Sequence, residues 1–424
     1  MTAHLVDRFV ELAAAHERMF WLDGGGSRAW SGRRSILGFL RDEDVSLSYD
    51  ATTRQVSRHR HGDVDTVGDD PFTVLAEELA RDAGDPSVSW VGYFGYACRG
   101  DLPARTGGGV PDAVWMRVKD PVFVDHDEEA GPATAGRAGD VTTPTGYAAA
   151  FTEVQRQLRL GNSYEVNLTY REVVSSPVDP VTAYLRLRAS SPAPYAGYLQ
   201  HPRGNGSVHL LSSSPERFAL VDRDGWLETK PIKGTTPRGG TPAEDEALRL
   251  SLGTDRKYRA ENLMIVDLLR NDLSMVCAPG TVTVPTLMEV ESYASVHQLV
   301  STVRGRLRDG VGTVDALRAL FPAGSMTGAP KLRTMSVIEH VEDSPRGAYA
   351  GAFGWVGADG RADLGVVIRS LVAIRDAGGD RDHWRYELGT GGGITVRSDV
   401  HQEYAETRWK AERLLAAVRP HEPR

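Results

Sequence analysis

The first 120 residues alternate apolar and polar positions in short runs, which predict one helix followed by several strands. The helix lies in MTAHLVDRFVELAAAHERMF, where apolar residues recur every three or four positions. Runs such as RRSILGFL and VSWVGYFGY come next, separated by turns rich in Gly and Asp. We therefore expect an N-terminal β-rich region over residues 1–124.

Periodicity is lost between residues 125 and 146. The stretch DHDEEAGPATAGRAGDVTTPTG mixes acidic residues with Gly, Pro, Ala and Thr and has almost no core-forming side chains. This composition is typical of an exposed linker or a long surface loop. It separates residues 1–124 from a second region, 147–424.

The second region groups strands and helices irregularly. Strand patterns occur in SYEVNLTY, PYAGYLQ and VHLLSSS, and again near residues 280, 349, 365 and 384. Helical spacing occupies Tyr147 to Leu160, Tyr258 to Leu269, Thr313 to Leu320, Lys331 to Val341 and Val400 to Val418. Because strands and helices do not alternate one by one, we expect an α+β fold. Its large, mostly antiparallel sheets would form a β-sandwich core flanked by helices.

Charge and cysteine content narrow the class of protein. The 424 residues carry 49 Lys and Arg against 57 Asp and Glu, a net charge of -8, so no basic field attracts nucleic acid or an acidic membrane. No apolar run is long enough to span a bilayer, and the charged first 20 residues do not resemble a signal peptide. Two cysteines, Cys98 and Cys277, suit a reducing compartment. We expect a cytoplasmic protein with neither a nucleic-acid nor a membrane partner.

Two helical segments carry carboxylates that suggest a metal site. In HQEYAETRWK, Glu403 and Glu406 project from one helix face with Lys410 one turn further along. On its own this stripe is more typical of a solvated surface helix. Glu261, however, lies beside the apolar run up to Leu269, so it needs a partner in a buried place. Carboxylates converging from two helices are suitable ligands for Mg²⁺.

Three Gly-rich turns could bind anions through exposed backbone N–H groups. They are PIKGTTPRGG, FPAGSMTGAPK and GTGGGI, and none matches a nucleotide-binding pattern. Each alone is more often only a turn. Together with Arg369 in a strand-like run and the candidate metal carboxylates, they favour a small ligand with more than one carboxylate.

Three further residues allow a catalytic or a structural interpretation. Lys233 follows Ile232 in the first of these turns, where partial desolvation would lower the pKa of its amine and make it a nucleophile or base. An exposed turn lysine is the commoner alternative. Glu216, in SSSPERF, and His297, in SVHQLVS, are each as consistent with a satisfied structural residue as with a catalytic one.

Nine motifs in order resemble those of the chorismate-utilising enzymes. They are SYEVNLTYR, SSPERF, PIKGTTPRG, AENLMIVDLLRNDL, SVHQLVS, PAGSMTGAPK, YAGAFGW, GTGGGI and EYAETRWK. The resemblance covers about residues 147–418 and includes relatives that make anthranilate, aminodeoxychorismate, isochorismate and salicylate. It implies the fold of an anthranilate synthase component I.

Two positions distinguish the branches of this family. Lys233 stands where aminodeoxychorismate synthases typically have Lys and anthranilate synthases have Ala. Glu165 stands at a position where the isochorismate and salicylate synthases are similar to each other, because both have a Lys that activates water. The resemblance thus implies conversion of chorismate and ammonia to 4-amino-4-deoxychorismate. An anthranilate synthase or a related aminating enzyme of specialised metabolism is the alternative, and a non-catalytic chorismate-binding subunit is a remote one.

The resemblance also implies residue roles. Glu216 would protonate the departing C4 hydroxyl, Lys233 would form a covalent adduct at C2, and His297 would stand beside the ring. Mg²⁺ would be bound by Glu261 and Glu406, with Glu403 holding a metal-bound water. The substrate carboxylates would meet Gly234, Thr235, Thr327, Tyr349, Arg369, Gly391, Gly392, Gly393 and Lys410. Tyr258 replaces an acid that usually supports the metal.

Ammonia needs a source outside these motifs. A glutaminase needs a nucleophilic Cys on a tight turn, and neither AYACRGD nor SMVCAPG resembles one. We therefore expect a glutamine amidotransferase subunit as partner.

Overall fold

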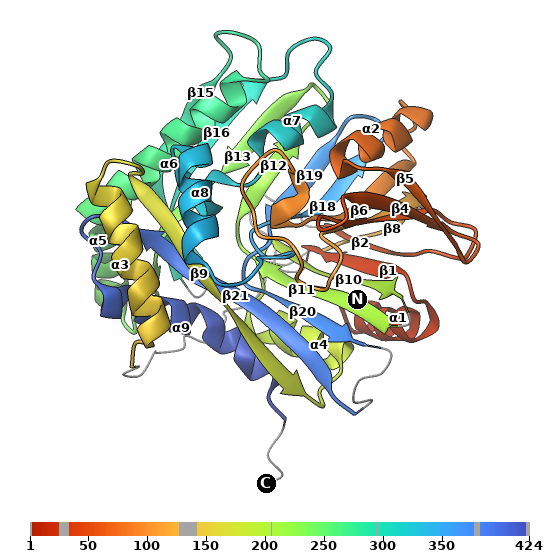
Figure 1. Ribbon diagram of the computed structural model, residues 1–424, viewed down its shortest axis with the longest axis horizontal. Coiled ribbons are helices and arrows are strands. Elements are labelled where there is room, and N and C mark those ends of the chain that lie inside the picture. The colour runs from red at the N-terminus through yellow and green to blue at the C-terminus, as the bar shows by residue number, and fades with distance from the viewer. Residues whose placement is uncertain are drawn as a thin grey trace.

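Two large antiparallel sheets face each other in the computed structural model, with helices packed on their outer sides (Figure 1). The structure describes residues 2–24, 34–126, 142–204, 206–293, 296–376 and 382–420. The segment expected as a linker lies mostly outside the described residues. Every strand pair among the described residues is antiparallel.

The first sheet has nine strands and carries one wall of the site described below. In spatial order they are β17 (Gly328–Ala329), β9 (Glu165–Ser176), β21 (Trp384–Ile394), β20 (Ser370–Arg375), β11 (Gly206–Ser214), β10 (Tyr195–Arg203), β1 (Met19–Asp23), β2 (Arg34–Phe39) and β8 (Val122–Asp125).

The second sheet has twelve strands. Its order is β14 (Ile232–Pro237), β16 (Val296–Arg306), β13 (Trp226–Lys230), β12 (Arg217–Val221), β19 (Ala362–Val366), β18 (Ala352–Gly357), β6 (Val88–Phe94), β7 (Ala113–Lys119), β3 (Ser46–Asp50), β4 (Gln55–Arg60) and β5 (Asp63–Gly68), with β15 (Thr283–Ser292) paired to β16. Strands from both sides of residues 125–146 thus share each sheet.

Helices cover the outer faces of both sheets. They are α1 (Thr2–Ala15), α2 (Pro71–Arg81), α3 (Thr145–Arg159), α4 (Pro180–Ser190), α5 (Pro242–Thr254), α6 (Arg256–Ser274), α7 (Thr313–Leu320), α8 (Lys331–Val341) and α9 (Val400–Val418), with short 3₁₀ turns η2 (Tyr96–Cys98) and η3 (Gly324–Met326). Apolar residues of α1, α4 and α9 form one core with the nine-stranded sheet, and those of α2, α6 and α7 form another with the twelve-stranded sheet. No described helix is long and apolar enough to cross a membrane.

The space between the sheets is filled by large apolar side chains. Phe20 and Leu199 from the first sheet are fully buried against Tyr93, Val114 and Phe353 from the second. Burial of this kind is the main favourable contribution to folding. The predicted α+β class, with antiparallel sheets and flanking helices, is confirmed.

Several predicted helices match the structure, and others were missed. The ranges 313–320, 331–341 and 400–418 agree to the residue, whereas α6 extends beyond its predicted range at both ends. The missed helices α2, α4 and α5 each begin with a Pro that follows an Asp or Thr cap. Pro at the first helical position after a capping residue is a start signal, so a search for it would have found all three.

Candidate active site

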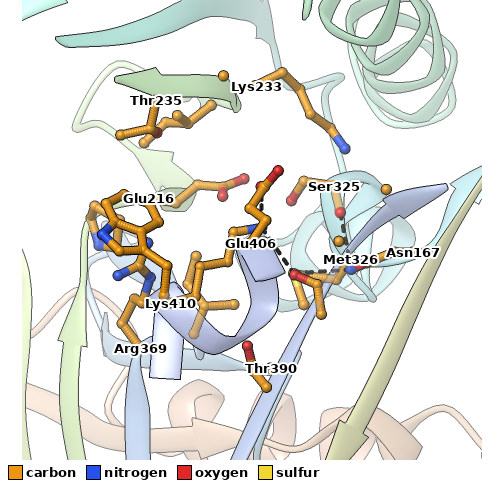
Figure 2. A pocket seen from close by; sticks show the side chains of 18 of the residues that line it. Asn167, Glu216, Lys233, Thr235, Ser325, Met326, Arg369, Thr390, Glu406 and Lys410 are labelled. Carbon is orange, nitrogen blue, oxygen red and sulfur yellow. Dashed lines mark hydrogen bonds and ion pairs between the residues drawn. The ribbon is translucent and has the colours of Figure 1, made fainter. Parts of the chain in front are cut away.

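A cavity of about 300 Å³ opens where β14, β21, α6 and α9 meet (Figure 2). The pairing of β21 with β9 places Gly393 opposite Asn167 and aligns both strands along one side. Most residues proposed from the sequence line this cavity: Glu216, Lys233, Gly234, Thr235, Glu261, Tyr349, Arg369, Gly391, Gly392, Gly393, Glu403, Glu406 and Lys410. Segments far apart in the chain are therefore brought together at one cavity.

Lys233 forms a buried ion pair beneath the cavity surface. Its Nζ contacts Oε1 of Glu165 on β9, and the side chains of Lys233 and Glu165 are 11% and 1% exposed. Gly393 makes this contact possible, because a Cβ there would collide with Glu165 Oε1 and lie 3.3 Å from Lys233 Nζ. The glycine motif thus admits a buried charge pair as well as exposing backbone.

The pKa of Lys233 differs from the sequence expectation. Burial alone lowers the pKa of this amine, but the negative charge of Glu165, followed by that of Glu261, outweighs burial and raises it above its ordinary value. Lys233 is therefore an ammonium in the free protein. The expectation of a free amine produced by desolvation is wrong, because the sequence did not reveal the carboxylate on β9.

Glu216 lies in the short buried connection between β11 and β12. Burial raises its pKa to about 7, while the neighbouring Ser325 hydroxyl and Lys233 ammonium partly oppose that rise. A carboxylic acid with this pKa is still about half protonated at neutral pH and can donate its proton to a departing oxygen. Glu216, Lys233 and Glu406 point into the same cavity from a turn, a strand and a helix (Figure 2).

Three carboxylates on α6 and α9 line the opposite side, held by two lysines. Lys257 Nζ lies 2.7 Å from Glu403 Oε1 and 3.9 Å from Glu261 Oε1, and Lys410 Nζ lies 2.7 Å from Glu406 Oε1. The ammonium of Lys410 lowers the pKa of Glu406. Burial raises the pKa of Glu261.

This carboxylate group fits a hard divalent cation by its chemistry. Glu261 Oε1 is buried and has no hydrogen-bond partner among the described residues, so an oxygen ligand is available. Within the described part of the chain no three acidic, His or Cys side chains are already gathered at metal-binding distance. The Lys257 ammonium stands between Glu403 and Glu261, so ion binding requires this lysine to move aside.

Arg369 supplies positive charge at another part of the lining. Its guanidinium is partly buried over the Trp409 ring, 5.3 Å from the centroid, and forms no salt bridge among the described residues. Burial lowers its pKa to about 10, which leaves it charged at neutral pH. Nearby, Gly234 has φ of 90°, and a Cβ there would lie 2.8 Å from Tyr258 Cγ. A bare backbone therefore lines the cavity at this point of β14.

Two proposed residues do not line the cavity. His297 is fully buried, with its ring nitrogens bonded to Ser292 Oγ at 2.8 Å and to Asp245 Oδ1 at 3.0 Å. Thr327 is also fully buried, and its carbonyl accepts a hydrogen bond from the backbone N–H of Asn167. Both side chains hold the framework around the cavity.

Several residues that line the cavity were not predicted from the sequence. Asn167, Gln298, Ser325, Met326, Lys257 and Trp409 all border the cavity. Asn167 lies two positions after Glu165 on the same strand, so strand alternation could have assigned both to one face. No comparable pattern marks Lys257, which looks like one more charged residue at a helix start.

The chain is similar to known proteins in both sequence and structure. The profile of a family described as chorismate binding enzyme matches residues 127–416. An aminodeoxychorismate synthase of Streptomyces pristinaespiralis is 40% identical over 97% of the chain and 63% of its own length. The anthranilate synthase component 1 of Streptomyces coelicolor is 35% identical over 90% of the chain and 84% of its own length.

A solved structure agrees with this result. The crystal structure of anthranilate synthase component I from Streptococcus pneumoniae superposes with a TM-score of 0.71 at 25% identity, covering 91% of this chain and 93% of that one. The chain spans 63% and 62% of the length of the aminodeoxychorismate synthases of Streptomyces pristinaespiralis and Streptomyces griseus.

Proposed function

Because the chain belongs to the chorismate binding enzyme family, we propose that it converts chorismate and ammonia to 4-amino-4-deoxychorismate, with ammonia supplied by a glutaminase partner. The observation that carries this proposal is the position of Lys233, whose amine lines the cavity beside Glu216. A lysine in this motif is the mark by which the chain resembles the aminodeoxychorismate synthases and differs from anthranilate synthases. The two Streptomyces aminodeoxychorismate synthases named above support the same assignment.

The reaction proceeds through two displacements. Lys233 Nζ, once neutral, forms a bond to C2 while the bond between C4 and its hydroxyl breaks. Glu216 gives its proton to that hydroxyl, which leaves as water. Ammonia then bonds to C4 as the bond between Nζ and C2 breaks, and Glu216 takes up the surplus proton. The amine that leaves C2 restores the original double bond, and the two successive displacements account for retention of configuration at C4.

Binding of the dianionic substrate uses both ends of the cavity. Arg369, Tyr349 and the backbone of Gly234 and Thr235 would hold the pyruvyl carboxylate. Lys410 and the backbone of residues 391–393 would lie at the ring carboxylate. Together with a bound Mg²⁺, these donors would give a protein of net negative charge a locally positive site.

Glu261 and Glu406 would hold Mg²⁺, with Glu403 alongside. When bound, the ion supplies positive charge that offsets the ring carboxylate. His297 touches no part of the cavity and takes no step in this scheme.

Product identity tests the proposal. The purified chain is incubated with chorismate, Mg²⁺ and an ammonium salt, and the product is identified by mass and chromatography against reference compounds. We expect 4-amino-4-deoxychorismate, with none formed when ammonium is omitted. Formation of anthranilate would overturn the proposal in favour of the alternative that the Streptomyces coelicolor relative suggests. Absence of any product would favour a non-catalytic binding subunit.

A further inference from the structure

The buried ion pair between Lys233 and Glu165 raises a requirement that the proposed function leaves open. An ammonium has no lone pair, so Lys233 must lose a proton before its nitrogen can attack. We propose that Glu165 is the base that removes this proton and later returns it. This inference rests on the proposed function, because it concerns the same covalent step.

The geometry places Glu165 in contact with the reacting nitrogen but away from the substrate. Its Oε1 contacts Lys233 Nζ directly, whereas Glu165 does not line the cavity that Lys233 lines. The carboxylate therefore approaches the amine from behind and leaves the cavity side free for C2. The other oxygen, Oε2, is buried with no hydrogen-bond partner among the described residues. Glu165 thus has an oxygen with which to carry a proton once the ion pair is neutralised.

Two other carboxylates influence Lys233, and each is engaged elsewhere. Lys233 interacts electrostatically with Glu165 on β9, Glu261 on α6 and Glu216 after β11. Glu216 is needed in its protonated form, and its pKa of about 7 keeps it so below neutral pH. Glu261 Oε1 lies 3.9 Å from Nζ of Lys257, one turn away on α6. Only Glu165 of these three has a direct ion pair with Lys233 in the described structure.

The proton balance closes over one turnover. Glu165 takes a proton from Lys233, which then attacks C2 as a neutral amine. The nitrogen becomes positively charged in the adduct. When ammonia displaces it, the amine leaves neutral and regains its proton from Glu165. No outside acid, base or oxidant is needed, and the overall change remains chorismate plus ammonia to the amino product plus water.

The test follows adduct formation with ammonia left out, so that titration of ammonia does not affect the result. The parent and Glu165→Gln are mixed with chorismate and Mg²⁺, quenched at set times, and the fraction of adduct is read from the intact protein mass. Glu165→Asp retains a carboxylate. Glu172→Gln, seven residues along the same strand and paired with Arg408 outside the cavity, is the matched control. Thermal unfolding checks that each variant is folded.

We expect the glutamine variant to form adduct at least about 10²-fold more slowly than the parent at pH 6, the range typical for loss of a positioned base. Its rate should rise about tenfold per pH unit below pH 7, because the proton must then be lost to solvent, whereas the parent rate should be flat there. The aspartate variant should lie nearer the parent, and Glu172→Gln should match it.

The outcomes separate the two proposals. A parent that forms neither adduct nor aminated product overturns the proposed function and, with it, the role of Glu165. A parent that forms adduct, together with a glutamine variant of equal rate, overturns the role of Glu165 alone. A slower glutamine variant whose rate shows the same flat pH profile as the parent also overturns it, since a purely structural defect would give that result. If Glu165→Gln does not fold, the aspartate variant decides the question. A rate slower than the parent's that rises with pH supports the role of Glu165. A rate equal to the parent's overturns it.

Discussion

The two sides of the cavity hold their charges in different ways. One side, here called the strand wall, consists of β9, β14 and β21 and carries Glu165, Lys233 and Gly393. The other, the helix wall, consists of α6 and α9 and carries three glutamates with Lys257 and Lys410. The strand wall has one buried pair, whereas the helix wall shares its carboxylates between two lysines that are 38% and 27% exposed.

The two walls therefore suit different chemical roles. On the strand wall, a buried ion pair and a glycine without a Cβ hold the amine against its carboxylate, which suits a bond-forming step that tolerates little displacement. On the helix wall, two long and partly exposed lysine side chains neutralise the carboxylates, and Lys257 lies near two of them, so the lysines can exchange partners. We interpret the strand wall as the covalent side and the helix wall as the ion-binding side.

Removing a carboxylate from the helix wall should have the largest effect. Glu261→Gln or Glu406→Gln should reduce amination at low Mg²⁺ by about 10³-fold or more, since several kcal/mol of charge stabilisation depend on the ion. Raising the Mg²⁺ concentration should recover part of the rate. The measurement is initial rate against Mg²⁺ concentration, with Glu246→Gln on the surface of α5 as control. An unchanged Mg²⁺ dependence in both variants would show that the helix wall does not bind the ion.

Removing the amine from the strand wall should come next. Lys233→Ala should abolish the covalent adduct and slow amination by about 10²-fold, equivalent to about 3 kcal/mol. Residual turnover would come from direct addition of ammonia to a cation stabilised in the same site. Intact mass after mixing with chorismate detects the adduct, and Lys119→Ala, exposed at the end of β7, is the control. Full activity in Lys233→Ala, or an adduct on another lysine, would refute the covalent role of the strand wall.

Glu216 links the two walls and should give a smaller, pH-dependent effect. Adduct formation should fall as pH rises through about 7, because Glu216 then loses the proton it must donate. The same shift affects folding. Its folded-state pKa lies above the ordinary value of 4.5, so the folded chain holds this proton longer than the unfolded chain does. Stability therefore decreases as pH rises from about 4.5 through about 7.

Glu216→Gln should remove that decrease. At pH 8 the variant should be more stable than the parent by up to about 3 kcal/mol, and the gain should shrink towards pH 5. Denaturant unfolding of the substrate-free protein at several pH values measures the difference. A constant difference across this range would mean that the pKa of Glu216 is not raised in the folded protein.

The sequence predicted the helix wall better than the contacts of the strand wall. Glu403, Glu406 and Lys410 follow helical spacing, which depends only on local geometry, and all three line the cavity. The contact between Glu165 and Lys233 joins β9 to β14, strands of different sheets, so no local pattern could reveal it. For the same reason the direction expected for the pKa of Lys233 was wrong, because the environment of this amine depends on that long-range contact.

For the fold, too, local patterns were recognisable in the sequence, whereas long-range contacts were not. Periodicity found α7, which has a pronounced apolar face, whereas α4 has a weak one and was recognisable mainly from its Pro start. The sheet order, in which β1 joins β10 and β6 joins β18, depends on packing between segments over 100 residues apart. Alternation placed His297 within a strand, as the structure has it. It could not show that the ring contacts Asp245, a residue of α5.

The last prediction concerns the source of ammonia and expects no effect from its key variant. Both cysteines are buried, and burial raises the pKa of each thiol, that of Cys277 to about 11. A buried protonated thiol is a poor nucleophile, so neither should hydrolyse glutamine. The chain alone should aminate chorismate with ammonium salts, faster at a given total ammonium when more NH₃ is free, until loss of the Glu216 proton dominates. It should be inactive with glutamine, and adding a matching glutaminase should give glutamine-dependent turnover.

The Cys98→Ser/Cys277→Ser double variant should keep the parent's ammonium-dependent rate, measured with folded fractions matched by thermal unfolding. Glutamine-dependent turnover by the chain alone, lost in the double variant, would place ammonia production inside this chain and add a third functional region to the two walls.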